Sequence, residues 1–186
     1  MIGYALCGSF CTFKESFECL KIVKEKYGDV LPIMSYNAYC TDTRFGEHGE
    51  WISKIEELCK NKIISTIVEA EPLGPKIKLD ALVIAPCTGN TLAKIANGIT
   101  DTPVCMAAKA HLRSDRPLVI ALASNDAMSA NFGNIGKLLN RKNVYFVPMN
   151  QDDPQKKPHS LVANFSLLEE TLTCALEGKQ IRKLFI

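Results

Sequence analysis

Residues 82–102 read Leu-Val-Ile-Ala-Pro-Cys-Thr-Gly-Asn-Thr-Leu-Ala-Lys-Ile-Ala-Asn-Gly-Ile-Thr-Asp-Thr. The apolar run from Leu82 to Ala85 predicts a strand that is covered on both faces, as in a parallel sheet. The helical pattern that follows begins with small polar residues. Their hydroxyl, amide and backbone N–H groups lie where the helix dipole favours an anion such as phosphate. The residues expected to surround this anion site are Pro86, Thr88, Gly89, Asn90 and Thr91.

Strand and helix patterns alternate along the rest of the chain. Apolar runs at 2–7, 30–34, 118–123 and 144–147 predict further strands, and the apolar stripe from Phe13 to Tyr27 predicts a helix that Gly28 ends. Alternating strands and helices favour a parallel sheet with right-handed crossovers. We therefore predict an α/β fold in three layers, a parallel sheet with helices on both faces, as a single domain over residues 1–186.

Three other segments lead to specific expectations. We expect a polar loop at 35–46, a short helix or turn with a loop at 65–80, and an exposed loop at 150–160. A closing helix is expected after them, because apolar residues recur there at helical spacing. Its stripe consists of Leu161, Phe165, Leu168, Leu172 and Leu176.

Parallel strands bring their carboxyl ends to one edge of a sheet, where such folds bind ligands. Small hydrogen-bonding residues follow four of the predicted strands at that edge. The first of these loops lacks the Gly-x-Gly-x-x-Gly pattern, so a mononucleotide fits this edge better than NAD. Helix capping and turn formation explain the small polar residues of any single loop. The presence of such residues in four loops at one edge favours a ligand site. The candidate residues in the other three loops are Gly8, Ser9, Phe10, Ser35, Asn37, Ser124 and Asn125.

Composition argues against several functional classes. The net charge of +2 comes from 22 basic and 20 acidic residues spread along the chain, so we expect no nucleic-acid partner. No apolar stretch approaches the ~20 residues of a membrane span, and the N-terminus lacks signal-peptide features, so we expect a cytoplasmic location. The eight cysteines include no Cys-x-x-Cys pair, which favours reduced thiols over a metal site. A functional thiol at Cys7, Cys11 or Cys87 is the alternative.

The segment from Ala85 to Asp101 resembles a known pair of motifs. They are Pro-Ala-Ser-Ala-Asn-Thr and the following Ala-Lys-Ile-Ala-x-Gly-Ile-Ala-Asp of the homo-oligomeric flavin-containing cysteine decarboxylase superfamily. The similarity spans nearly the whole chain and includes Gly8-Ser9 after the first strand and Ser35 after the second. It implies a Rossmann-like, flavodoxin-like flavoprotein that binds FMN, often at the interface of a trimer.

Three further segments resemble one group within that superfamily, the flavoprotein B subunits of dipicolinate synthases. They are Thr-Asp-Thr-Arg-Phe-Gly at 41–46, Glu-Ala-Glu-Pro-Leu-Gly-Pro at 69–75 and Ala-Ser-Asn-Asp-Ala-Met at 123–128. The resemblance implies oxidation of a dihydrodipicolinate-type precursor from the lysine pathway to dipicolinate during sporulation. It also implies a separate A subunit that carries NAD(P), and a homo-oligomer that is a trimer or a multiple of trimers.

The chain departs from other members of the superfamily. Its cysteine decarboxylases carry an active-site histidine in the helix before the central strand, and no histidine stands between residues 49 and 110 here, which disfavours decarboxylation. Arg113 and Arg116 resemble only in part the basic segment of the flavin prenyltransferases. A decarboxylase or prenyltransferase of the same superfamily is one alternative, and a non-catalytic flavin-binding subunit is another.

The implied substrate is a small dicarboxylate, and a guanidinium group binds carboxylates in a bidentate manner. Arg44, in the loop after the second strand, is the candidate substrate-binding residue, with a solvated loop charge or a subunit contact as the equal alternative. Glu69 and Glu71 are candidates for a base at the same edge, or for the acidic cap of a short helix. The catalytic residue stays unassigned.

Overall fold

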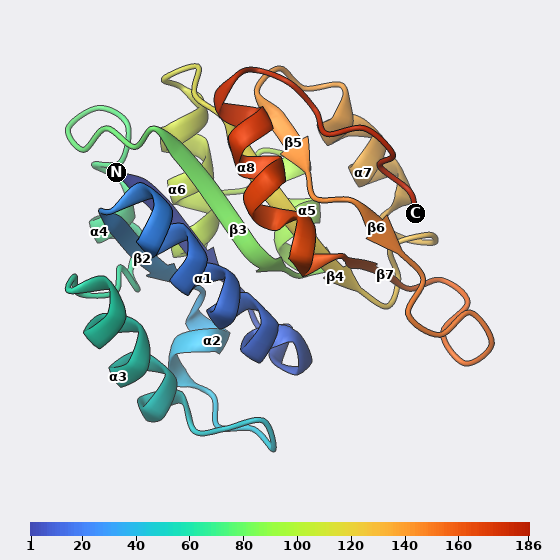
Figure 1. Ribbon diagram of the computed structural model, residues 1–186, viewed down its shortest axis with the longest axis horizontal. Helices are drawn as coiled ribbons and strands as arrows, with labels where there is room; N and C mark the ends of the chain where they lie inside the picture. The colour runs from blue at the N-terminus through green and yellow to red at the C-terminus, as the bar shows by residue number, and fades with distance from the viewer.

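The central sheet has seven strands in the computed structural model, which describes residues 1–186 (Figure 1). The strands are β1 (Ile2–Leu6), β2 (Val30–Met34), β3 (Ala81–Cys87), β4 (Leu118–Ser124), β5 (Val144–Phe146), β6 (Met149–Asn150) and β7 (Leu161–Ala163). Their order across the sheet is β2-β1-β3-β4-β7-β6, and β5 also pairs with β4.

Five of these strands, β2, β1, β3, β4 and β5, run parallel. All residues of β1 and β3 are buried. Strands in the middle of a three-layer fold are covered on both faces, which is why their sequences are continuous apolar runs and not alternating patterns. The predicted parallel sheet is confirmed for this part of the molecule.

The sheet ends in an antiparallel extension. Because β5 stops beside Ile120, the carboxyl end of β4 is free to pair with β7, and β7 pairs in turn with β6. The sheet is therefore mixed, with this antiparallel extension added to the parallel strands that the sequence predicts. Leu161, expected on the closing helix, begins β7 instead. Its spacing of four residues to Phe165 is compatible with a helical stripe but does not require one. The segment between β6 and β7 is an exposed loop, as expected.

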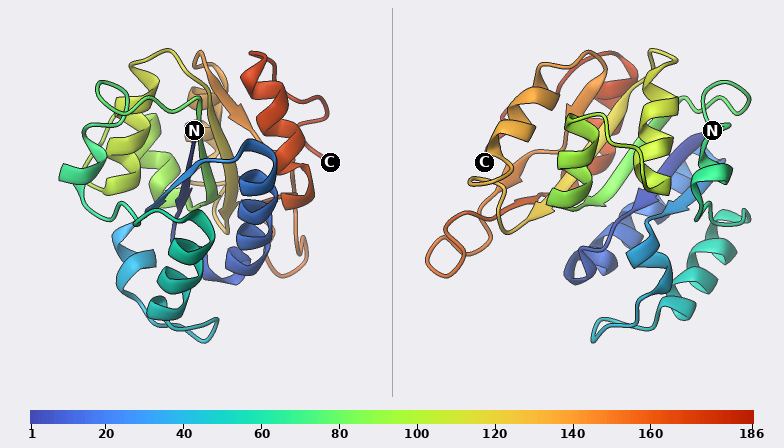
Figure 2. Two further views of the ribbon diagram at one scale, coloured as in Figure 1. Left: turned by 60° about the vertical axis from the view of Figure 1, so that its left-hand side comes forward. Right: turned by 180° about the vertical axis from the view of Figure 1, so that it is seen from behind.

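Helices cover both faces of the sheet, as predicted (Figure 2). One face carries α1 (Phe13–Tyr27), α3 (His48–Cys59) and α8 (Leu168–Leu176), and the other carries α4 (Ile67–Ala70), α5 (Gly89–Ala96), α6 (Pro103–Leu112) and α7 (Phe132–Leu139). A separate apolar core lies on each side of the sheet. Gly28 ends α1 with φ of 76°, as its position after the apolar stripe predicts.

One short helix lies in a segment that we expected to be a loop. Helix α2 (Tyr36–Cys40) begins directly after Ser35, whose Oγ accepts a hydrogen bond from the Ala38 N–H at 3.3 Å. Five residues are too few to establish a helical period in the sequence, so only the cap residue indicated this element.

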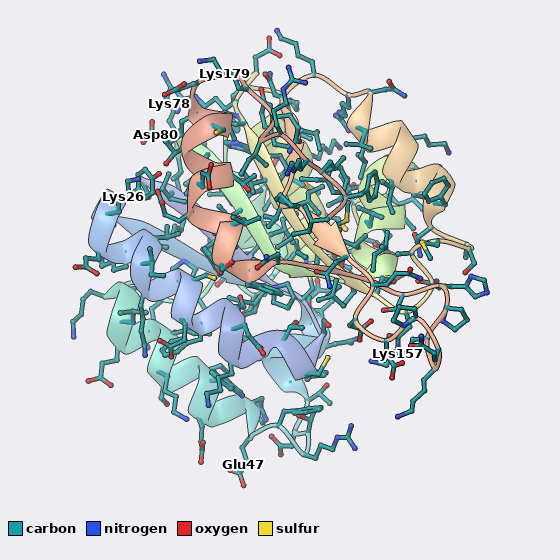
Figure 3. All side chains as sticks on the ribbon, turned by 45° about the vertical axis from the view of Figure 1, so that its right-hand side comes forward. Lys26, Glu47, Lys78, Asp80, Lys157 and Lys179 are labelled. Carbon is teal, nitrogen blue, oxygen red and sulfur yellow. The ribbon has the colours of Figure 1, made fainter.

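The connections place the ligand-binding edge. From β1 the chain crosses to β2 on one side and later to β3 on the other, so a crevice forms where the carboxyl ends of β1 and β3 diverge. The loops at 41–47 and 151–160 project beyond this edge (Figure 1). Figure 3 shows Glu47 and Lys157 on that side of the molecule and Lys78 and Asp80 at the far end. None of the helices combines the length and the apolar character that crossing a membrane requires.

Candidate functional site

A pocket of about 400 Å³ opens at the carboxyl ends of β1, β2 and β3. It is lined by Gly8, Ser35, Tyr36, Asn37, Thr88, Asn90, Thr91, Lys94, Asp101 and Thr102. Residues predicted from three separate loops therefore meet in one place. A larger cleft of about 780 Å³ lies beside α8 and the C-terminal segment, but none of the predicted residues line it.

The N-terminus of α5 forms one wall of the pocket. Thr88 is its N-cap, and the Thr88 Oγ1 accepts a hydrogen bond from the Thr91 N–H at 3.3 Å and contacts the Thr91 Oγ1 at 3.2 Å. The first N–H groups of an α-helix, here those of Gly89 and Asn90, have no acceptor within the helix. They are the donors that a phosphate group requires.

The loops after β1 and β2 form the opposite wall. A Cβ at Gly8 would make ordinary van der Waals contact with the Phe10 ring at 3.4 Å and with the Asn37 Cβ at 3.6 Å, so Gly8 lies beside both side chains. Phe10 packs on Phe13 with ring centroids 5.4 Å apart, which fixes the loop. Ser35 presents its capping hydroxyl to the same space, and Asn37 is exposed there.

Gly89 lets the loop after β4 approach α5 closely. A Cβ at Gly89 would lie 2.4 Å from the Ser124 Oγ and 2.8 Å from the Asp126 Oδ1. The Asp126 carboxylate accepts hydrogen bonds from Ser124 and from the Asn131 Nδ2, the latter at 3.1 and 3.0 Å. Ser124 is thereby held beside the helix N-terminus, while Asn125 next to it is exposed; neither lines the pocket.

The remaining predicted residues lie around the pocket. The Ser9 carbonyl accepts a hydrogen bond from the Thr12 Oγ1 at 2.9 Å, within the turn that leads into α1. The carbonyl of the buried Pro86 accepts the Cys7 N–H at 3.1 Å, which joins the ends of β1 and β3. Arg44 is exposed in the 41–47 loop with its guanidinium 4.9 Å from the Phe45 ring centroid, outside the pocket lining.

Sequence reasoning missed four lining residues, namely Tyr36, Lys94, Asp101 and Thr102. The Lys94 Nζ lies 2.8 and 2.9 Å from the two Asp101 carboxylate oxygens, and this ammonium lowers the pKa of Asp101 from its ordinary value. Thr102 caps α6 by accepting the Cys105 N–H at 3.2 Å. Lys94 was detectable, since it follows Asn90 by four residues and so shares its helix face.

The alternative roles considered for Cys7, Cys87 and the two glutamates find little support. Burial raises the pKa of Cys7 to about 12 and that of Cys87 well above its ordinary value, so both thiols stay protonated and weakly nucleophilic near neutral pH. Glu69 forms the capping box of α4 with Thr66, which confirms the acidic-cap interpretation, and Glu71 is exposed at the end of that helix.

The pocket suits a mononucleotide such as FMN. Its donors are hydroxyl, amide and backbone N–H groups with a single ammonium, a set that binds a phosphate ester and the carbonyl groups of a heterocycle. Its volume falls within the usual range of small-molecule sites. No cluster of histidine, cysteine or carboxylate side chains suited to a metal ion occurs.

Comparisons with known proteins agree with this geometry. The chain matches the family model named Flavoprotein over residues 4–165. It is 45% identical over 185 residues to the dipicolinate synthase B subunit of Bacillus subtilis (strain 168), a match that covers 100% of this chain and 92% of the relative. The crystal structure of the dipicolinate synthase B subunit from Bacillus halodurans C superposes with a TM-score of 0.91 at 45% identity, over 100% of this chain and 95% of that chain.

A more distant structure shares the fold. The FMN-dependent cysteine decarboxylase SpaF superposes with a TM-score of 0.69 at 21% identity, over 95% of this chain and 94% of that chain. The family model spans most of the chain, and the relatives at 45% identity resemble it along its whole length. The chain therefore belongs to the flavoprotein family and, within it, to the dipicolinate synthase B subunits.

Proposed function

We propose that this chain binds FMN and acts with a dipicolinate synthase A subunit to oxidise a dihydrodipicolinate-type precursor from the lysine pathway to dipicolinate during sporulation. The observation that carries the proposal is the pocket at the carboxyl ends of β1 to β3, in a chain that is 45% identical to dipicolinate synthase B subunits. We infer that the chain works as one domain over residues 1–186 in the cytoplasm.

Each wall of the pocket has a distinct task in this proposal. The free N–H groups at the start of α5, with Thr88, Thr91 and Ser35, bind the phosphate of FMN. Bound FMN supplies a hydride acceptor, and the protein orients the ring and excludes water. Residues adjoining the lining shape the loops that hold it. These are Ser9, Phe10, Pro86, Gly89, Ser124 and Asn125.

The substrate is a small dicarboxylate, and Arg44 is its proposed ligand. The Arg44 guanidinium lies on an exposed loop that projects beyond the binding edge, where it is free to pair with a carboxylate. A position outside the pocket lining suits contact with a substrate that sits over the flavin or at a neighbouring subunit.

The proposed partners are an A subunit that carries NAD(P) and further copies of this chain, as a trimer or a multiple of trimers. The loop after β1 lacks the glycine pattern of dinucleotide-binding proteins, which supports a division of labour between two subunits. Apolar side chains of Ile99, Phe132 and Leu139, beside α5 and on α7, are 47%, 56% and 37% exposed, and their burial would stabilise such an assembly.

The alternatives within the superfamily lack support from the site. No histidine lines the pocket, although the superfamily's decarboxylases use one. Arg116 donates a hydrogen bond to the Leu79 carbonyl at 2.6 Å and pairs with Asp80 at 3.6 Å, so it lies near the start of β3, at the opposite end of the sheet from the pocket. Its position does not fit the phosphate site of a prenyltransferase.

Turnover tests the proposal. The purified chain, an A subunit and the dihydrodipicolinate-type precursor are combined with FMN and NAD(P), and dipicolinate is followed by its ultraviolet absorption. Product that requires both subunits and FMN supports the proposal. Product that forms equally well when FMN is left out favours a flavin-binding subunit without a catalytic role, and absence of product from the complete mixture contradicts the proposed reaction.

A further inference from the structure

Lys94 and Asp101 are the charged residues of the pocket. The two residues come from different elements, since Lys94 lies within α5 and Asp101 precedes Thr102, the N-cap of α6. The Lys94 side chain is 21% exposed, whereas the Asp101 side chain is 58% exposed. The Lys94 side chain is thus largely covered, and its ammonium contacts the more exposed Asp101 carboxylate.

The geometry leaves one donor of Lys94 unused. An ammonium group has three N–H donors, and two of them account for the contacts with Asp101 at 2.8 and 2.9 Å. The third N–H has no other acceptor in the chain, although Lys94 lines the pocket. A ligand in the pocket can accept it.

The pair suits an uncharged acceptor more than a phosphate dianion. Lys94 and Asp101 together carry no net charge, so they offer a strong hydrogen bond with little net attraction for an anion. The phosphate site proposed above lies at the start of α5, and Lys94 lies about 6 Å farther along the same helix face. This separation leaves Lys94 free to meet the part of a bound mononucleotide that lies beyond its phosphate.

We propose that Lys94, positioned by Asp101, donates a hydrogen bond to the carbonyl edge of the flavin pyrimidine ring and raises the reduction potential of the bound flavin. The inference rests on the proposed FMN binding. When the flavin takes up two electrons and one proton, the pyrimidine edge gains negative charge, and a nearby cation stabilises this charge. The Asp101 carboxylate opposes this effect, because it partly neutralises the cation. Lys94 is therefore a binding residue and Asp101 a positioning residue.

Two substitutions separate this role from a structural one, because their effects have opposite signs. Lys94→Gln removes the cation and lowers the midpoint potential of bound FMN, while Asp101→Asn frees the cation and raises it. We expect each change to alter the ratio of the dissociation constants of oxidised and reduced FMN at least tenfold. For a two-electron couple, this corresponds to a shift of the midpoint potential by about 30 mV. Lys94→Arg keeps the positive charge, so its midpoint potential stays close to that of the wild-type chain.

The measurement is a reductive titration of the full chain with bound FMN, using dithionite and a reference dye. Lys54→Gln is the matched control, since Lys54 pairs with Glu50 at 3.2 Å on α3, outside the pocket lining, and its loss leaves the potential unchanged. The dissociation constants of FMN and riboflavin are measured alongside. If Lys94 contacts the ring, Lys94→Gln weakens the binding of FMN and the binding of riboflavin by a similar factor.

The inference is overturned if Asp101→Asn leaves the midpoint potential unchanged or lowers it. This test does not depend on whether Lys94→Gln folds. It is also overturned if Lys94→Gln weakens FMN selectively over riboflavin, because Lys94 would then bind the phosphate. A wild-type chain that fails to bind FMN is a different result, since it contradicts the proposed function on which this inference depends.

Discussion

Gly89 packs against polar side chains at the carboxyl edge of the sheet, where a Cβ fits only if these side chains move. A Cβ there would lie 2.4 Å from the Ser124 Oγ and 2.7 Å from the Nδ2 of Asn131, which is 5% exposed. We expect Gly89→Ala to cost about 1–3 kcal/mol of unfolding free energy, as overpacking typically does. Urea denaturation measures this change. We also expect weaker FMN binding, because the start of α5 is displaced.

Gly133→Ala is the matched control for this substitution. Gly133 lies within α7, and a Cβ there meets nothing within 4 Å. Alanine in an open helical position raises the unfolding free energy by up to about 1 kcal/mol relative to glycine. Equal urea midpoints for Gly89→Ala and the wild-type chain would contradict the close packing at Gly89.

At the scale of elements, two helix caps of similar chemistry have different positions. Ser35 caps α2 at the pocket, and Thr66 caps α4, outside the pocket lining. Replacing either with alanine should cost about 1 kcal/mol of unfolding free energy, the usual value of a cap. Only Ser35→Ala should also weaken FMN binding, which fluorescence titration measures. Equal losses of FMN affinity in both variants would mean that stability alone is responsible.

We expect His111 of helix α6 to make the stability of the molecule depend on pH. His111 is buried in its last turn, with Nε2 donating to the Pro117 carbonyl at 2.9 Å and Nδ1 without a partner, and burial lowers its pKa from the ordinary 6.5. Well above pH 6.5 the residue is neutral in both the folded and the unfolded state. Below it the unfolded chain takes up the proton first, so stability falls as pH decreases toward the folded-state pKa.

Unfolding by urea between about pH 7.5 and 5.5 tests this effect. His111 contributes a loss of at most about 1.4 kcal/mol per pH unit, which His111→Gln should remove from the wild-type profile. His159→Gln, at an exposed position, should leave the profile unchanged. If both variants follow the wild-type curve, other groups determine the pH dependence.

The elements predicted correctly are those with a continuous apolar run or with enough residues to reveal a helical period. The continuous apolar residues of β1 and β3 and the long stripe of α1 required no tertiary information. Helix α2 was missed because five residues establish no period. Leu161 was misassigned because its spacing fits a helix, and its pairing with Ser124 depends on how far β5 extends along β4.

At the scale of the whole molecule, the pocket was predictable only in part. The loops after parallel strands reach one edge by topology, so Gly8, Ser35 and Thr88 could be brought together from sequence. The pairing of Lys94 with Asp101 depends on how α5 meets the start of α6, a packing detail that no local pattern encodes. Arg44 stays a prediction, because its ligand lies outside the isolated chain.

The arrangement of layers also predicts which thiols react. Cys11 and Cys40 are exposed, Cys174 is partly exposed, and the other five cysteines are buried. We expect a thiol reagent to modify Cys11 and Cys40 rapidly in the native protein and all eight cysteines in guanidinium chloride. Peptide mass analysis identifies the modified positions. Rapid native modification of Cys7 or Cys87 would contradict the burial of the loops beneath the pocket.

The most direct test of the proposed FMN pocket is the visible absorption spectrum of the purified chain before and after addition of FMN, with the released ligand identified by mass. The account predicts flavin bands, a ligand with the mass of FMN and saturable binding that Ser35→Ala weakens. A colourless protein that leaves the absorption and fluorescence of added FMN unchanged would contradict the assignment of the pocket at the ends of β1, β2 and β3.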